Sequence, residues 1–390
     1  MVMGRSVGGP AGSGPGISPI TGVTRLTRVT QQAWDPTAFR TEVQATLDAF
    51  LADQATRLAP LGGDAARLLS EARVTVTGGK RFRAAFCHWG YAALAGAPSG
   101  ADAEAVRRAA AALELLHASA LVHDDLMDAS DTRRGRSATH RTFERAHRAD
   151  GWRGDPEQYG AAAAILLGDL LLSWADELLR RCGLGWDRVG PALEVFDLCR
   201  SEVIAGQFLD VSVQARGRAD VAQAMTVLRY KSAKYSIERP LHVGAALAGA
   251  DPAALDLLTG FGLPLGEAFQ LRDDLLGVFG DPATTGKPAG DDLVEGKRTV
   301  LVALALDHAA PADAERLDAA LGTPLAEPEV AELRAIIDGC GARAEVETMI
   351  DDLARQAVEA LRRGQAEAGW DAEACGVLEQ LAAAATRRTR

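Results

Sequence analysis

The sequence predicts an all-α protein. Hydrophobic residues make up 47% of the 390 residues, and Ala and Leu, which favour helices, dominate that set. Runs of β-branched residues, which favour strands, are short. Apolar residues recur with helical spacing from about Asp35 onward, with only short Gly- and Pro-containing breaks such as 62–63. We therefore expect one helical domain over residues 35–385, a disordered N-terminal tail over 1–34 and a basic tail over 386–390.

Charge and cysteine content exclude several classes of function. A net charge of −11 argues against a nucleic-acid partner, so any anion site must be a local cluster of Arg and Lys. The longest apolar stretches, such as 161–172, fall short of the roughly 20 residues that a membrane span needs, so no span is expected. The five cysteines are widely spaced and include no C-x-x-C pair. They predict neither a disulfide framework nor a zinc site, and they favour a reducing cytoplasm.

Residues 113–131 join an apolar helical pattern to a group of carboxylates. Asp124 and Asp128 are four residues apart, so they lie on one helix face about 6 Å apart along the axis, with His117 on the same stripe. Two carboxylates placed in this way repel each other unless a cation joins them. Mg²⁺ prefers a few carboxylate oxygens completed by water and phosphate oxygens. In isolation such a cluster is as often a solvated face, but the apolar run before it favours a metal site.

A second aspartate pair repeats this design in residues 266–277. Gln270, Asp273 or Asp274, and Gly277 follow one helical stripe. If the two helices face each other across a cavity, their carboxylates can hold a diphosphate through several Mg²⁺ ions and neutralise it as a leaving group. The two pairs together are much less easily explained as coincidence than either pair alone.

Basic residues accompany both pairs. Residues 78–83 read G-G-K-R-F-R and begin a helix, so free backbone N–H groups and the helix dipole join Lys and Arg in binding an anion. Residues 131–135, D-T-R-R-G, directly follow the first carboxylates, and Arg suits bidentate phosphate contact. Arg81 and Lys234 are expected to be solvated surface cations. The cations interpreted as diphosphate ligands are Lys80, Arg83, Arg133 and Arg134.

Eight short motifs are spread along most of the chain. In order they are G-G-K-R-F-R at 78–83, E-L-L-H-A-S-A-L-V-H-D-D-L-M-D at 114–128, D-T-R-R-G at 131–135, G-D-L-L-L at 168–172, G-Q-F-L-D at 206–210, Y-K-S-A-K-Y at 230–235, F-Q-L-R-D-D at 269–274 and G-K-P-A-G-D-D-L-V-E-G-K-R-T at 286–299. With these motifs in this order, the chain resembles the trans-isoprenyl diphosphate synthases, the polyprenyl synthetase family. It is most similar to bacterial geranylgeranyl diphosphate synthases.

The resemblance implies a single large bundle or barrel of antiparallel helices around a central cavity, usually paired as a homodimer. It also implies binding roles. Isopentenyl diphosphate would be held by Lys80, Arg83, His117 and Arg134. Allylic diphosphates would contact Arg133, Lys231, Gln270, Lys287 and Lys297, with Gln207 and Ser232 also in the substrate site. Two or three Mg²⁺ ions would be bound by Asp124, Asp128 and Asp273. The implied catalytic residues are Asp124, Asp125, Asp128, Lys231, Asp273 and Asp274.

The chain departs from the family pattern at two positions. Gly277 stands where the second motif of the family has a third Asp, and Asp281 and water are the candidates for the missing ligand. Ser232 stands where a Thr is common and keeps the hydroxyl.

The implied reaction is head-to-tail condensation of isopentenyl diphosphate with C5 to C15 allylic diphosphates. Product length should depend on the side chains below the first aspartates, along which the tail grows. Ala120 and Ser119 are small, and the next bulky residues, Leu116 and Leu113, lie about 12 and 17 Å below Asp124. We therefore predict a C20 product, with C15 and longer products as the alternatives.

Three other functions use related features. A class I terpene cyclase would need a second motif resembling N-D-x-x-S-x-x-x-E, and the chain contains no Asn. A head-to-head synthase of the squalene type is disfavoured by the G-K-R and R-R pieces, which point to a separate isopentenyl diphosphate site. An inactive regulatory subunit would have no chemical need for intact aspartates.

Overall fold

The computed structural model of the chain describes residues 8, 34–218, 220–281 and 290–387. Residues 36–390 form one compact unit. Most of the tail predicted over 1–34, the last three residues of the chain and Lys287 lie outside the described residues. Because α1 begins at Pro36 and α17 ends at Thr386, the helices begin and end within a residue or so of the predicted domain limits. The disorder expected of the two tails stays a prediction.

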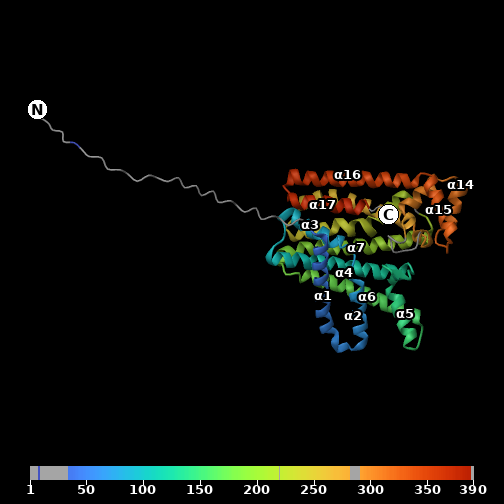
Figure 1. Ribbon diagram of the computed structural model, residues 1–390, viewed down its shortest axis with the longest axis horizontal. Helices are drawn as coiled ribbons and strands as arrows, with labels where there is room; N and C mark the ends of the chain where they lie inside the picture. The colour runs from blue at the N-terminus through green and yellow to red at the C-terminus, as the bar shows by residue number, and fades with distance from the viewer. Residues whose placement is uncertain (1–7, 9–33, 219, 282–289, 388–390) are drawn as a thin grey trace. The chain divides into compact units, whose positions relative to one another are not determined.

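The unit is built almost entirely of helices, and the predicted all-α class is confirmed (Figure 1). The first helices are α1 (Pro36–Leu58), η1 (Ala59–Leu61), α2 (Gly63–Thr75), α3 (Phe82–Ala95) and α4 (Gly100–Met127). A two-stranded hairpin, β1 (Thr132–Arg133) and β2 (Arg136–Ser137), precedes α5 (Thr139–Ala149), α6 (Pro156–Arg180), α7 (Trp186–Arg216) and α8 (Val221–Leu228). The π-helix η2 (Arg229–Glu238) continues into α9 (Arg239–Leu247), which is followed by α10 (Pro252–Phe279). The last elements are α12 (Asp291–Val294), α13 (Val300–His308), α14 (Pro311–Ala320), α15 (Glu327–Gly339), α16 (Ala342–Ala368) and α17 (Ala372–Thr386).

Local sequence explains where the long helices begin. The side chain of Asp251 accepts a hydrogen bond from the backbone N–H of Ala254, and Pro252 occupies the first turn of α10. At the start of α6, the side chain of Asp155 likewise accepts a hydrogen bond from the backbone N–H of Glu157, and Pro156 occupies the first turn. An Asp cap followed by Pro is favourable because the side chain satisfies a free N–H group and Pro lacks one.

The two aspartate-bearing helices have different neighbours. α4 packs on α6, α3 and α1, whereas α10 packs on α16 and η2. Figure 1 shows α16 and α17 side by side, and both helices contact α10. The end of α10 that carries the second aspartate pair rests on a fully buried apolar cluster that includes Val278, Val300, Ile337 and Val346. This packing holds the end of α10 in place.

The π-helix η2 lies between α7 and α10, and two glycines permit the close approach. A Cβ atom at Gly206 of α7 would lie 2.4 Å from the backbone nitrogen of Lys231, and one at Gly266 of α10 would lie 2.5 Å from the carbonyl oxygen of Ala233. Any larger residue at either position would push the helices apart. Helices of this rare, wide type occur often at functional sites. Among the described helices, none is long and apolar enough to cross a membrane.

Candidate active site

A cavity of about 1380 Å³ extends between α4, α7, η2 and α10. Its polar part contains most of the residues that the sequence singled out. These are Lys80, Arg83, His117, Asp124, Arg133, Arg134, Gln207, Lys231, Ser232, Gln270, Asp273, Asp274 and Lys297. Its apolar part is lined by α4, α6 and α7, through Leu116, Ala120, Leu172, Val203 and Ile204. Asp125 and Asp128 are buried just behind the wall, each with 5% of its side chain exposed.

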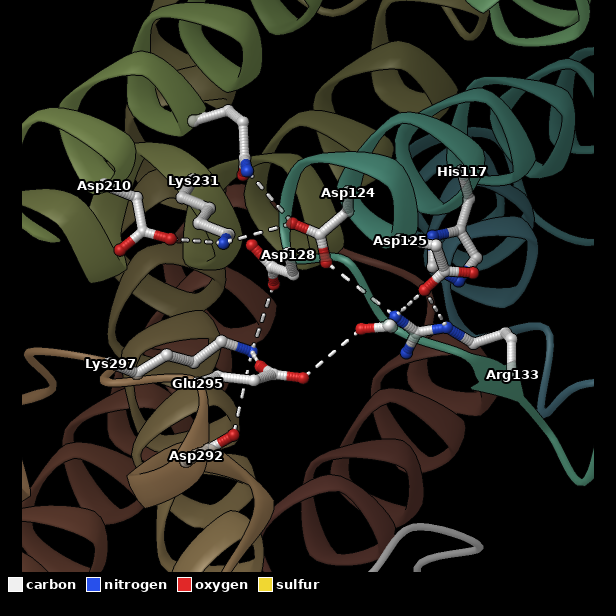
Figure 2. A network of polar contacts seen from close by, with 12 residues as sticks. His117, Asp124, Asp125, Asp128, Arg133, Asp210, Lys231, Asp292, Glu295 and Lys297 are labelled. Atoms are coloured by element: carbon white, nitrogen blue, oxygen red, sulfur yellow. Dashed lines mark hydrogen bonds and ion pairs between the residues drawn. The ribbon is translucent and has the colours of Figure 1, made fainter. Parts of the chain in front are cut away.

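Asp124 is the centre of a network of polar contacts (Figure 2). Its Oδ1 accepts a hydrogen bond from Nε2 of Gln207 at 3.0 Å and lies 3.3 Å from Nζ of Lys231. Lys231 in turn pairs with Asp210 at 2.5 Å. Burial opposes the charge of Asp124, but Lys231, Lys297 and Arg133 together hold its pKa below the ordinary value. The carboxylate is therefore charged and faces the cavity.

Asp125 holds Arg133 in place. The Nε of Arg133 donates to Oδ1 of Asp125 at 2.7 Å, and the same guanidinium lies 3.8 Å from Asp124. The hairpin places Arg133 opposite Arg136, and its two-residue turn, Arg134–Gly135, has φ of 53° and 71°. Positive φ at both positions is typical of a type I′ turn. The turn directs Arg134 back to the G-G-K-R-F-R loop.

That loop and the hairpin meet at the cavity. A Cβ at Gly79 would lie 3.2 Å from Nη2 of Arg134, and Nη1 of Arg134 donates to the carbonyl of Thr77 at 3.3 Å. Gly78 and Gly79 have φ of 77° and 89°, which glycine adopts without strain. The structure thus brings the two predicted basic segments together beside the start of α3, with Lys80 exposed at their junction.

Asp128 lies against Lys297, which comes from the segment after α12. The distance between Asp128 Oδ2 and Lys297 Nζ is 3.5 Å, and Lys297 also contacts Glu295 at 2.6 Å and Asp292 at 3.6 Å. Burial and the nearby charge of Asp124 raise the pKa of Asp128 to about 6. Burial opposes the charge of Lys297, but Asp292 and Glu295 raise its pKa well above the ordinary value. Figure 2 shows Lys297 between the first aspartates and Asp292.

The second aspartate pair lies on α10. Nε2 of Gln270 donates to Oδ1 of Asp274 at 2.8 Å. Burial and the charge of Asp292 raise the pKa of Asp274 to about 8. The Asp292 carboxylate occupies the space of the side chain that Gly277 lacks, since a Cβ there would lie 1.9 Å from Oδ2 of Asp292. Asp281 and water were the candidates from the sequence for this place, but Asp281 is exposed and is not among the residues that line the cavity.

The prediction that Arg81 is a surface cation is wrong. Its side chain is 4% exposed, and its Nη1 lies 3.0 Å from Oε2 of Glu114, which is equally buried. Arg81 has φ of 57°, and its Nη2 donates to Gln44 at 2.6 Å. Because the other Glu114 oxygen accepts from the backbone N–H of Ala84 at 3.1 Å, this pair fastens the start of α3 to α4.

The same prediction for Lys234 is also wrong. Its side chain is 13% exposed, and Nζ lies 2.8 Å from Glu202 of α7. Glu202 also accepts from Arg239 at 2.7 Å. Lys234 therefore joins η2 to α7.

Four residues that the structure places in or beside this network had no role predicted for them from the sequence. Asp210, Asp292 and Glu295 fall inside two of the motifs. Asp210 contacts Lys231, 21 residues away, whereas Asp292 and Glu295 contact Lys297 of their own motif. Tyr235 ends the Y-K-S-A-K-Y motif, and its hydroxyl contacts Nδ1 of His117 at 2.6 Å. The motifs at 206–210, 230–235 and 286–299 were the signal that could have identified them.

Comparison with known proteins decides the family. The polyprenyl synthetase family model matches residues 66–338. The chain belongs to the polyprenyl synthetase family. A short chain isoprenyl diphosphate synthase of Methanothermobacter thermautotrophicus is 34% identical over 295 residues, which cover 75% of this chain and 83% of that protein. A geranylgeranyl diphosphate synthase of Mycobacterium tuberculosis is 33% identical over 286 residues, covering 73% and 75%.

A solved structure of this family is similar throughout the compact unit. The geranylgeranyl pyrophosphate synthase of Corynebacterium glutamicum, complexed with isoprenyl diphosphate and magnesium, superposes with a TM-score of 0.87 and 39% identity. The match covers 91% of this chain and 100% of that protein. The chain is therefore a trans-isoprenyl diphosphate synthase and a prenyltransferase, as predicted. Curated relatives are named for farnesyl, geranylgeranyl and geranylfarnesyl products.

Proposed function

We propose that this prenyltransferase makes geranylgeranyl diphosphate by head-to-tail condensation of isopentenyl diphosphate with C5 to C15 allylic diphosphates. The observation that carries the proposal is the shape of the cavity. Carboxylates from α4 and α10 and cations from four segments line its polar part, and small side chains on α4 leave an apolar extension directly below Asp124. A diphosphate head and a hydrocarbon tail require these two environments side by side.

Divalent cations fit the donor set of the polar part. Asp124 and Asp128 are one helical turn apart, and Asp273 lines the cavity from α10. Burial and neighbouring carboxylates raise the pKa of both Asp128 and Asp274, which indicates an excess of buried negative charge that a cation would relieve. We assign Asp124, Asp128 and Asp273 to Mg²⁺, two or three ions, with Asp125 and Asp274 in support. Bound there, Mg²⁺ supplies charge stabilisation for a departing diphosphate.

The polar side chains of the cavity divide between two substrates. Lys80, Arg83, His117 and Arg134 lie around the start of α3 and would hold isopentenyl diphosphate. The allylic diphosphate would lie closer to the aspartates. Its ligands would be Arg133, Lys231, Gln270 and Lys297, with Gln207 and Ser232 beside them and Lys287 from outside the described residues. These side chains bind and orient the substrates, and a preorganised set of cations stabilises developing charge without a cost of rearrangement.

The chemistry itself needs little from the protein beyond charge and position. The bond between the allylic carbon and its diphosphate breaks, and the double bond of isopentenyl diphosphate attacks that carbon to form the new carbon–carbon bond. A proton then leaves, and the released diphosphate accepts it. The apolar side chains of Leu116, Leu172 and Val203 line the tail region and limit the access of water, which would otherwise capture the allylic cation.

The C20 product length follows from the apolar part of the cavity. Ala120 and Ser119 are small side chains on the helix face below Asp124, although Leu121 of the same turn also lines the cavity. Two turns below Asp124, Leu116 is the deepest bulky apolar side chain of α4 among the lining residues. The opposite wall comes from Leu172 of α6 and Val203 of α7. A cavity that ends at the depth of Leu116, its floor, supports a C20 product over a C15 one.

We further propose that the enzyme is a cytoplasmic homodimer joined through α6 and α7. Those helices expose large apolar side chains, namely Ile165, Leu166, Leu198, Ile204, Phe208 and Val211. Phe208 alone is 71% exposed. An apolar face of this kind marks an interaction site, and a second copy of the same face is its simplest complement. Phe208→Glu should convert a dimer into a monomer in light scattering; an unchanged mass would refute this interface.

The test of the function is a direct incubation. Purified protein is mixed with Mg²⁺, labelled isopentenyl diphosphate and, separately, C5, C10 and C15 allylic diphosphates, and the dephosphorylated products are separated by chromatography. We expect a C20 alcohol from each primer. A C15 or longer alcohol would keep the reaction and overturn the product length. A cyclic hydrocarbon, or no incorporation with any primer, would refute the function.

A further inference from the structure

Tyr235 lies between His117 and Arg83, two residues assigned to isopentenyl diphosphate. Its side chain is 6% exposed and lines the cavity. Its hydroxyl lies 2.6 Å from Nδ1 of His117, which joins η2 to α4. Burial raises the pKa of Tyr235 to about 12, so the hydroxyl keeps its proton and can donate it to a hydrogen bond.

Arg83 rests on the ring of the same tyrosine. Its Cζ lies 4.1 Å from the ring centroid, a cation–π distance, and Nη2 donates to Oγ of Ser236 at 2.7 Å. Within the described part of the chain, the buried Nε of Arg83 has no hydrogen-bond partner. A buried donor left in this way is costly, and an anion in the cavity would remove that cost. Tyr235 and Ser236 thus fix a guanidinium that still has an N–H available for a ligand.

The hydrogen bond at Nδ1 decides what His117 can offer on its other nitrogen. Burial and the charges of Arg83 and Arg134 lower the pKa of His117 well below its ordinary value, so the ring is neutral and carries one proton. If Tyr235 donates to Nδ1, the proton is on Nε2, and Nε2 is a hydrogen-bond donor. If Nδ1 donated to Tyr235 instead, Nε2 would present a lone pair and repel a diphosphate.

We propose that Tyr235 is a positioning residue for isopentenyl diphosphate: its hydroxyl donates to Nδ1 of His117 and fixes the tautomer with the proton on Nε2, while its ring supports Arg83. The inference rests on the proposed function, which assigns His117 and Arg83 to this substrate. It adds a residue that acts through its two neighbours rather than by touching the reacting atoms.

Nuclear magnetic resonance of the wild-type protein tests the tautomer without any change at Tyr235. In protein labelled with ¹⁵N-histidine, the two ring nitrogens of each tautomer have different shifts, and the His117 signals are assigned by their loss in His117→Gln. We expect the Nε2-protonated form. The Nδ1-protonated form would overturn the proposal.

Tyr235→Phe then tests the effect on binding, because it removes the hydroxyl and keeps the ring under Arg83. We expect roughly five- to tenfold weaker binding of isopentenyl diphosphate by calorimetry, the effect of one lost hydrogen bond. The KM of the allylic substrate should stay within twofold. In a His117→Ala background, Tyr235→Phe should have no further effect on isopentenyl diphosphate binding, as expected for residues that act as a unit.

Tyr91→Phe is the matched control. The Tyr91 hydroxyl donates to Asp102 at 2.7 Å, and Arg188 lies 5.5 Å from its ring, but Tyr91 is not among the cavity residues. It should leave the affinity for isopentenyl diphosphate unchanged. Equal affinity in wild type and Tyr235→Phe would overturn the proposal. A wild type that binds isopentenyl diphosphate but does not condense it would refute the function and leave this inference in place.

Discussion

Replacing Asp292 by Ala tests which carboxylate takes the place of the side chain that Gly277 lacks. The Oδ2 of Asp292 lies 1.9 Å from the position of a Cβ at 277, so its carboxylate fills the place of a third aspartate on α10. Lys297 would lose one carboxylate in Asp292→Ala but keep Glu295 at 2.6 Å. The substitution therefore removes charge from the second aspartate region while Lys297 stays paired.

The expected loss is about 10- to 100-fold in affinity for Mg²⁺, the range found when a residue that supports a metal ligand is removed. Asp281→Ala is the control, because Asp281 is exposed and does not line the cavity. It should stay within about twofold of wild type. The readouts are the Mg²⁺ concentration for half-maximal condensation and calorimetric binding of Mg²⁺ with inorganic diphosphate.

A carboxylate exchange provides a stricter test. In Gly277→Asp, the Asp292 carboxylate must move about 1.5 Å to reach ordinary contact at 3.4 Å. Because it is the end of a side chain, we expect a modest loss of stability, about 1–2 kcal/mol, together with weaker Mg²⁺ binding. The double variant with Asp292→Gly should recover both. If Asp281→Ala lowers Mg²⁺ affinity as much as Asp292→Ala, or if the double variant recovers neither property, Asp292 does not take the place of the missing side chain.

Three further predictions concern the apolar cavity, the start of α3 and the metal. Ala120→Phe should shift the product from C20 towards C15, because the ring closes the space one turn below Asp124; an unchanged chromatogram would contradict the proposed floor. Glu114→Gln should lower the free energy of unfolding by about 3–5 kcal/mol, because it leaves the buried Arg81 charge without a carboxylate. Denaturant titration followed by far-ultraviolet circular dichroism measures this change. As the control, Glu379→Gln, in an exposed pair with Arg362, should change the free energy of unfolding by less than about 1 kcal/mol. Chelation with EDTA should abolish condensation and added Mg²⁺ should restore it; activity that persists after exhaustive chelation would exclude the metal assignment.

Features that depend on a single helix could be predicted from the sequence. Asp124 and Asp128 lie one turn apart at the end of α4 because helical spacing requires it. The G-G-K-R-F-R segment does begin α3, since its two glycines adopt positive φ and the helix starts at Phe82. In both places, the pattern of a few neighbouring residues is enough to predict the local geometry.

Features that depend on contacts between distant segments could not be predicted in this way. Arg81 resembles a surface cation because its partner, Glu114, is 33 residues away and a left-handed backbone turns its side chain inward. Lys234 lies on a π-helix, whose wider turn the usual 3.6-residue period does not describe. Asp292 lies beside Gly277 because α12 packs against α10. No local sequence pattern predicts that contact.

In the proposed homodimer, one face of α7 would both line the cavity and contact the partner subunit, so the shape of the cavity would depend on association. Ile204 and Phe208 are exposed, at 58% and 71%, and they also line the cavity. In a monomer, water would replace part of the cavity wall around the growing hydrocarbon chain. On dilution below the dissociation constant of the proposed dimer, the hydrocarbon tail would meet solvent at α7 before it reached Leu116. The distribution of chain lengths would then vary with enzyme concentration, and product analysis across a dilution series would report the association equilibrium.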